Sequence, residues 1–185
     1  DFDLLRREFA KVKKKNLVLK DLEEVIQQKL DSMLFANPDR INYYERYQQI
    51  IDDYNSEQDR ATIEKTFMEL MDLANQMSQE EQRYVREGFT SDEELSLYDM
   101  LFRDDLSKTD IKKLKEVAAS LLQKIKSKIA EFDHWTDKQE TKAAIDNLIR
   151  DTLWAELPEC YDEVSISMYR QQIYEYVYTR YRTVA

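Results

Sequence analysis

A regularly spaced apolar stripe near the middle of the chain constrains its fold more than any other feature. Apolar residues recur there every three or four positions, at Ile63, Phe67, Leu70, Ala74 and Met77. This spacing places the side chains on one face of a helix, so we predict a long helix over about residues 57–87. Gly88, the only glycine, follows it and predicts its end, because glycine readily takes the left-handed conformation of a helix C-cap.

The chain on both sides of this helix also predicts helices. Thr90 or Ser91 is expected to open the next one, with Glu93 and Glu94 completing a capping box. Further stripes predict helices over about 4–14, 20–36, 38–54, 92–104, 107–130, 137–154 and 162–182. Asn16 is expected to break the first helix and Thr136 to cap the seventh. The residues expected to point inward include Val25, Ile41 and Trp154.

Turn-forming residues are too scarce for a many-stranded sheet. The 185 residues contain one glycine and two prolines, so few positions can supply special backbone angles. We predict an all-α, multi-helix bundle of about eight helices with one long central helix. Residues 1–185 are expected to form a single domain, in which 1–88 is a first helical half ending in the long helix and 89–185 a second.

Charge is segregated along the chain. The net charge is −10, which argues against a freestanding nucleic-acid binder. Residues 1–20 nevertheless hold seven basic and three acidic groups, and residues 108–128 hold seven lysines and two acids. Cys160 is the only cysteine, which excludes an internal disulfide and predicts a reducing, cytoplasmic location. No apolar run reaches the roughly 18 residues of a membrane span, and the start at Asp1 suggests a piece of a larger protein.

Short motifs follow one another in an order that resembles a known family. They are Lys15-Asn16, Asp21-Leu22, Lys29-Leu30, Met33-Leu34, Arg40-Ile41, Glu45-Arg46-Tyr47, Ile50-Ile51-Asp52, Glu69-Leu70, Glu80-Glu81-Gln82-Arg83, Arg86-Glu87-Gly88, Ser91-Asp92-Glu93-Glu94-Leu95 and Tyr98-Asp99. From roughly residue 15 to 185 the chain resembles the C-terminal helical region of the R (motor) subunits of type I restriction–modification enzymes.

The resemblance implies a role within a larger assembly. In that family an R subunit joins a nuclease domain and two ATP-hydrolysing, DNA-translocating motor domains to a helical part, which docks the motor on the methyltransferase core. The expected partners are the M and S subunits, the other domains of the R subunit and double-stranded DNA, with no membrane. ATP and Mg²⁺ would belong to the parent subunit, and no cofactor is expected in this part.

Catalytic motifs are not recognisable in the chain. A phosphate-binding loop needs several glycines, and His134 with Cys160 cannot complete a zinc site. A serine–histidine–aspartate triad would depend on His134 alone. Asp110-Ile111-Lys112, with Asp104 or Asp105, and Glu140-Thr141-Lys142 mimic nuclease motifs. Both lie on predicted helices or caps, so Asp110 is better interpreted as an acid of the first helical turn.

The lysines of residues 108–128 form the clearest candidate binding surface. At 100° per residue, one flank of the predicted helix, within about 60°, holds Lys108, Lys112, Lys115 and Lys126. Three more lie toward the other side, at Lys113, Lys124 and Lys128. Flexible ammonium groups suit DNA phosphates without base specificity. The alternative is an ordinary solvated face. Lys11, Lys13, Lys14 and Lys15 form a second, weaker candidate.

The last predicted helix carries a candidate protein interface. One face can be filled by Ile166, Tyr169, Ile173, Tyr176 and Val177. A neighbouring face presents residue types enriched in interfaces, namely Arg170, Tyr174, Tyr178, Tyr181 and Arg182. A tyrosine-rich core is an equally good interpretation. The sequence thus predicts a non-catalytic domain for assembly and DNA contact, with a purely structural helical adaptor without DNA contact as the alternative.

Overall fold

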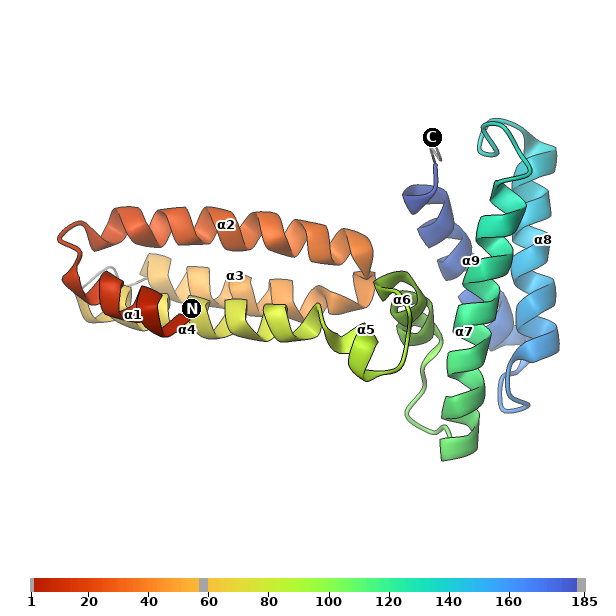
Figure 1. Ribbon diagram of the computed structural model, residues 1–185, viewed down its shortest axis with the longest axis horizontal. Helices are drawn as coiled ribbons and strands as arrows, with labels where there is room; N and C mark the ends of the chain where they lie inside the picture. The colour runs from red at the N-terminus through yellow and green to blue at the C-terminus, as the bar shows by residue number, and fades with distance from the viewer. Residues whose placement is uncertain (1, 57–59, 183–185) are drawn as a thin grey trace. The chain divides into compact units, whose positions relative to one another are not determined.

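The computed structural model describes residues 2–56 and 60–182, whose regular structure is entirely helical (Figure 1). In these residues the elements are α1 (Phe2–Lys11), α2 (Lys15–Ala36), the 3₁₀ helix η1 (Pro38–Arg40), α3 (Ile41–Ser56), α4 (Arg60–Glu80), α5 (Arg83–Arg86), α6 (Asp92–Leu101), α7 (Lys108–Ile129), α8 (Gln139–Glu156) and α9 (Glu163–Arg180). The prediction of an all-α, multi-helix protein is confirmed. None of these helices is both long and apolar enough to cross a membrane.

The chain forms two compact units, Asp1–Arg83 and Tyr84–Ala185. Each unit buries its own cluster of apolar side chains. The boundary falls within α5, a little before the predicted division after Gly88. The assignment of the whole chain to one domain stays a prediction.

In the first unit, α2, α3 and α4 lie alongside one another and α1 packs on α4 (Figure 1). The predicted stripe of α4 is confirmed, because Ile63, Phe67, Leu70 and Met77 are buried. Phe9 of α1 stacks on Phe67, with the ring centroids 3.7 Å apart. The apolar residues spaced three or four positions apart therefore form the face of α4 on which the other helices of this unit pack.

A buried ion pair joins η1 to the end of α4. The Arg40 side chain is 3% exposed and that of Glu80 10%. Arg40 Nε donates to Glu80 Oε1 at 3.1 Å, and Arg83 Nε donates to the same oxygen at 2.9 Å. Two guanidinium groups thus compensate one carboxylate that is nearly out of contact with water, as a buried charge requires.

In the second unit, α7 packs against α6 and α8, and α9 packs against α8 and α6. The core side chains of α7 are Leu114, Val117, Ala118, Leu121, Leu122, Ile125 and Ile129. Its first turn is closed by a capping box, in which the Ser107 hydroxyl accepts from the Asp110 backbone and the Asp110 carboxylate accepts from the Ser107 backbone. This confirms the interpretation of Asp110 as a first-turn acid.

The long central helix predicted over residues 57–87 is not clearly shown, and its predicted start at 57–59 lies outside the described residues. α4 ends at Glu80, and the Gln82 N–H donates to the carbonyl of Gln79, three positions back, before α5 begins at Arg83. The apolar stripe stops at Met77, so a straight continuation would bury nothing more. Gly88 does adopt the left-handed conformation, with φ of +84°, but it lies beyond the short α5.

Several other local predictions are wrong. Asn16 lies inside α2, which begins at Lys15, and the break falls between Lys11 and Lys15 instead. The N-cap of α8 is Lys138 rather than Thr136, and it makes no side-chain capping bond. The prediction for the start of α6 is confirmed, because the Ser91 side chain caps it by accepting from the Glu94 backbone.

Three residues expected to point inward are exposed to solvent. The exposed fractions are 61% for Val25, 48% for Ile41 and 62% for Trp154. Val25 and Trp154 each lie directly beside a buried residue of the same helix, Ile26 and Leu153, and Ile41 is the first residue of α3. One position changes the direction of a helical side chain by about 100°, which is enough to move it out of the core.

Candidate functional site

The lysine-rich surface belongs to α7, whose inner side is fixed by the core of the second unit. Lys108 and Lys112 are exposed, and neither ammonium group has a hydrogen-bond or ion-pair partner among the described residues. They are four positions apart, so their ammonium groups lie on the same side of the first two turns. A cation at the start of a helix also opposes the helix dipole. These two lysines are therefore open to an external anion.

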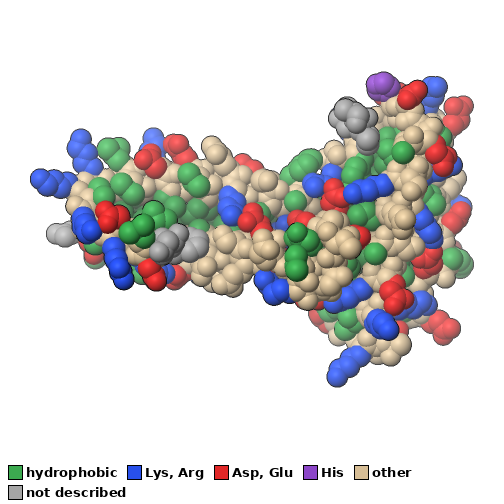
Figure 2. Space-filling view, in the orientation of Figure 1, with side chains coloured by type: hydrophobic (Ala, Val, Ile, Leu, Met, Phe, Trp, Pro, Cys, Tyr) green, Lys and Arg blue, Asp and Glu red, His purple; other side chains and the backbone are tan. Residues whose placement is uncertain are grey.

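The other lysines of α7 have partners within the protein. Lys113 donates to the Leu157 carbonyl at 3.4 Å. Four more pair with carboxylates. The pairs are Lys115 with Glu87, Lys124 with Glu156, Lys126 with Glu93, and Lys128 with Glu131. Figure 2 likewise shows acidic and basic side chains mixed over the visible face. A phosphate would have to displace these acids, so their predicted DNA contacts stay predictions.

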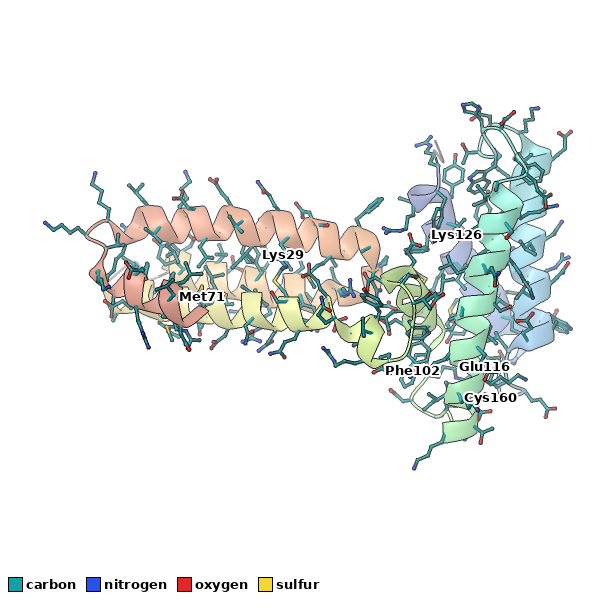
Figure 3. All side chains as sticks on the ribbon, viewed as in Figure 1. Lys29, Met71, Phe102, Glu116, Lys126 and Cys160 are labelled. Atoms are coloured by element: carbon teal, nitrogen blue, oxygen red, sulfur yellow. The ribbon has the colours of Figure 1, made fainter. Side chains whose placement is uncertain are left out.

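Glu93 of α6 is the centre of the most connected of these ion pairs. It accepts from Lys126 of α7, labelled in Figure 3, and from Arg180 of α9 at 3.3 Å. Burial alone would raise the pKa of Glu93, but the hydrogen bonds and charge of Lys126 and the bond from Arg180 outweigh it and lower that pKa. Lys126 also lies over the Tyr181 ring, 5.7 Å from its centroid. Glu93 thus joins three helices of the second unit, α6, α7 and α9.

The tyrosines of α9 pack inside the second unit. The Trp135 side chain is 2% exposed and meets Tyr174 and Tyr178 edge-on, with centroids 6.3 and 5.7 Å away. Its indole Nε1 donates to the Tyr181 carbonyl at 2.8 Å. The three tyrosines remain half-buried. Of the two interpretations of these tyrosines, the geometry favours a tyrosine-rich core over a protein interface. The predicted contacts of the tyrosines with a partner stay predictions.

The two arginines of the predicted interface lie differently. Arg170 Nε is 3.4 Å from Asp146 Oδ1, and Arg170 lines, with Lys142 and Tyr174, an open cavity of about 510 Å³ between α8 and α9. Arg182 is exposed and lies 5.6 Å from the centroid of the Tyr178 ring. A partner can therefore reach both guanidinium groups, while it reaches only part of each tyrosine.

The sequence analysis did not predict three exposed apolar side chains of the second unit. Trp154 is 62%, Val164 77% and Met168 52% exposed. Val164 and Met168 are four positions apart on α9 and share one side of it. Trp154 lines a cavity of about 330 Å³ with Pro158 and Ile166, among others. The exposure of Trp154 could have been predicted from the spacing of α8. Its buried stripe is Ile145, Ile149 and Leu153, and Trp154 lies next to that stripe.

In the described residues, the acids of the two nuclease-like motifs have structural roles at helix starts. Asp110 accepts from both the backbone and the hydroxyl of Ser107, at 3.2 and 2.6 Å. Glu140 lies in the first turn of α8, where an acid favours the helix dipole. His134 lies in the turn before α8 with φ of 53°. Within the described parts of the chain, no three acidic, histidine or cysteine side chains are grouped to hold a metal ion.

The chain belongs to the C-terminal domains of type I restriction endonuclease subunits. A family model described as type I restriction enzyme HindI endonuclease subunit-like, C-terminal, matches residues 2–175. The match covers nearly the whole chain and confirms the resemblance seen in the motif series. No curated protein and no solved structure gives a significant match.

Proposed function

We propose that this helical domain is non-catalytic, that it assembles the R subunit with the methyltransferase core of M and S subunits, and that it adds contacts to the DNA backbone. ATP and Mg²⁺ would be used by the other domains of the same subunit. The observation that carries the DNA part is the pair Lys108 and Lys112, two exposed cations without an internal partner in the described chain. Because the chain belongs to a restriction endonuclease family, DNA is the anion that we expect these two lysines to bind.

We expect the Lys108→Gln/Lys112→Gln variant of the full R subunit to bind unrelated duplexes more weakly, and by a similar factor for each sequence. Phosphate contacts carry no base information, so the loss is independent of sequence. The slope of log affinity against log salt should fall by about 0.9 for each contact removed. Fluorescence anisotropy with labelled duplexes at several salt concentrations measures both quantities.

The matched control is Lys124→Gln/Lys128→Gln on the same helix. These lysines pair with Glu156 and Glu131, and the variant has the same net charge as the test variant. It should retain the wild-type slope. If the two variants behave alike, or if neither changes the slope, the free lysines are an ordinary solvated face.

A purely structural adaptor is the second candidate, and a specific observation favours it. Four of the seven lysines of α7 are paired with carboxylates of the second unit. Two of these pairs, Lys124–Glu156 and Lys126–Glu93, connect α7 to neighbouring helices without any external ligand. This candidate differs from the first in predicting no change of DNA affinity for either lysine variant.

The assembly part of the proposal has its support in the exposed apolar residues of α8 and α9. Isolated exposed apolar residues are common on proteins, but a tryptophan at 62% exposure beside a cavity is a typical interface anchor. The cavity lined by Arg170 and Tyr174, and the exposed Arg182, lie on the same two helices or directly after them. We assign the contact with the methyltransferase core to α8 and α9.

We expect Trp154→Ala to weaken the binding of the R subunit to its methyltransferase core by about 2 kcal/mol, which is roughly 30-fold. The fold should be unchanged, because the indole is mostly in water in this chain. Val85→Ala removes a side chain of similar exposure, 58%, from α5 and should bind normally. Titration of the core with each variant measures the dissociation constants. Wild-type affinity of a folded Trp154→Ala variant would exclude this anchor.

A further inference from the structure

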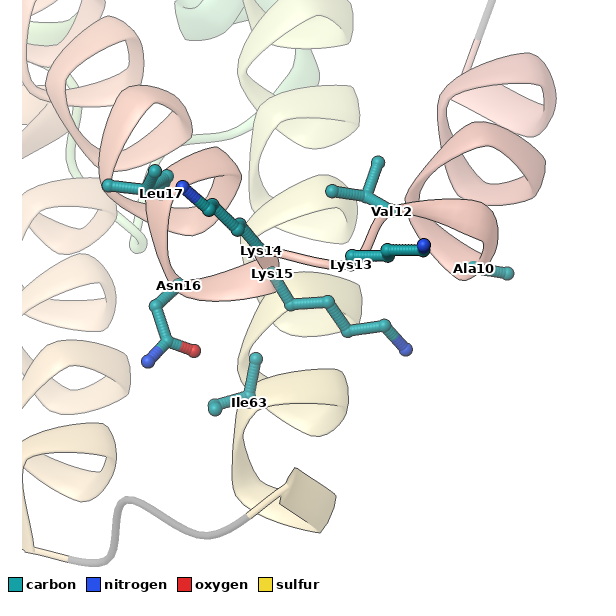
Figure 4. Close-up of a pocket in the computed structure, with 8 residues that line it drawn as sticks. All are labelled: Ala10, Val12, Lys13, Lys14, Lys15, Asn16, Leu17 and Ile63. Atoms are coloured by element: carbon teal, nitrogen blue, oxygen red, sulfur yellow. The ribbon is translucent and has the colours of Figure 1, made fainter.

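A basic hollow lies at the corner between α1 and α2, in the first unit. Its volume is about 760 Å³, and it is lined by Ala10, Val12, Lys13, Lys14, Lys15, Asn16, Leu17 and Ile63 (Figure 4). Three consecutive lysines thus border one open cavity. Neither the lysines of α7 nor the exposed side chains of α8 and α9 belong to it.

The three lysines are not equivalent. The Lys15 ammonium donates to Glu64 at 2.5 Å and lies 5.3 Å from the centroid of the Phe9 ring. Its side chain is 14% exposed, so Lys15 is anchored and its charge is compensated. Lys13 and Lys14 are exposed, and within the described residues neither ammonium group has a hydrogen-bond or ion-pair partner. The hollow therefore offers two uncompensated cations on an anchored corner.

The remaining wall of the hollow is mostly apolar. Ala10 and Val12 come from the end of α1 and the turn after it, Leu17 from the first turn of α2 and Ile63 from α4. Leu17 is 56% exposed. A ligand that covers this wall gains from apolar contact while its charged groups face the lysines. Its chemistry must combine anionic groups with short carbon surfaces.

The directions of the lysines indicate an extended ligand. In Figure 4, Lys13 and Lys15 extend to one side of the corner, whereas Lys14 extends toward Leu17. Ammonium groups that diverge in this way suit separate anionic groups better than a single small anion. A nucleic-acid strand carries one phosphate per nucleotide at regular intervals, with a sugar between successive phosphates. It matches both the diverging cations and the apolar wall.

We propose that this hollow binds the sugar–phosphate backbone of DNA, with phosphates at Lys13 and Lys14 and deoxyribose against Val12 and Leu17. The proposal rests on the proposed function in one respect, namely that the assembly containing this domain acts on DNA. It places a DNA contact in the first unit, separate from the contact proposed for α7. The two contacts can be tested independently.

The test compares the full R subunit with its Lys13→Gln/Lys14→Gln variant, using a fluorescein-labelled 20-base-pair duplex at about 50 to 200 mM salt. If two phosphate contacts are lost, the slope of log affinity against log salt falls by up to about 1.8. Over this fourfold range of salt, the wild-type affinity should then decrease about tenfold more than that of the variant. A control variant, Lys20→Gln/Lys65→Gln, has the same net charge and alters exposed lysines of α2 and α4 outside the hollow. It should keep the wild-type slope.

Three results would overturn the proposal. Equal losses in the test and control variants would mean that only net charge matters. A polyglutamate peptide that binds as tightly as the duplex, with the same loss in the test variant, would identify an acidic protein segment as the ligand. Binding of inorganic phosphate that is lost in the test variant, with an unchanged duplex slope, would identify a small anion. The Lys108→Gln/Lys112→Gln variant, measured in parallel, shows whether the α7 contact fails separately from this one.

Discussion

Replacement of Trp135 by alanine is expected to destabilise the second unit by about 3–5 kcal/mol, the usual cost of removing a large buried aromatic side chain. The indole is nearly inaccessible and is the common neighbour of Tyr174 and Tyr178. Its loss would leave a cavity between the turn before α8 and the end of α9. It would also remove the donor for the Tyr181 carbonyl. Urea denaturation followed by circular dichroism measures the free energy of unfolding.

Trp154→Ala is the matched control, because it deletes the same side chain at an exposed position. It should change the free energy of unfolding by no more than about 0.5 kcal/mol. When the assembly experiment is included, each variant should affect a different quantity. Trp135→Ala should lower stability, and Trp154→Ala should lower partner affinity. Equal stability losses would contradict the burial described for these residues.

The second large effect is expected in the first unit, at the buried ion pair. Arg40→Met removes one of the two guanidinium groups that compensate Glu80. Breaking a buried pair from one side typically costs about 3–5 kcal/mol, because the remaining charge is left uncompensated. Arg83 still contacts Glu80 in this variant, so we expect about 3 kcal/mol. The measurement is again the free energy of unfolding in urea.

Arg46→Met provides the control for this variant. Arg46 is exposed and donates to Gln76 at the surface of the same unit, so its replacement should cost about 0.5 kcal/mol or less. The double variant Arg40→Met/Glu80→Leu should recover part of the loss, because it removes the uncompensated charge as well. If Arg40→Met were no more damaging than Arg46→Met, the pair would contribute nothing to stability.

The helices could be predicted because their apolar residues repeat at the helical spacing. The stripe from Ile63 to Met77 is buried as expected, and Ser91, Ser107 and Asp110 act at helix starts as their residue types suggest. The ends of helices were less predictable. The polar stretch after Met77 favours a helix locally, but tertiary contacts do not prolong it. Asn16 has a modest helix propensity, but it lies exposed in the first turn of α2, where it does not interrupt the helix.

The candidate surfaces could be predicted only in part, because neutralisation by distant residues leaves no local signal. Lys115 pairs with a carboxylate 28 positions away, and Lys126 with one 33 positions away. No periodicity within α7 indicates such partners. The tyrosines of α9 posed a similar problem, because their neighbour Trp135 lies in a turn outside any stripe. In contrast, the free state of Lys108 and Lys112 fits the expected basic flank.

Both tryptophans of the chain lie in the second unit. Excitation of indole therefore yields an optical signal from that unit alone, whereas the peptide absorbance of helices comes from both units. The buried indole of Trp135 should emit toward the blue and resist quenching by acrylamide. The exposed indole of Trp154 should emit toward the red and lose intensity readily. The emission spectrum of this domain can thus distinguish a partner covering α8 from a ligand bound to the first unit, without any label.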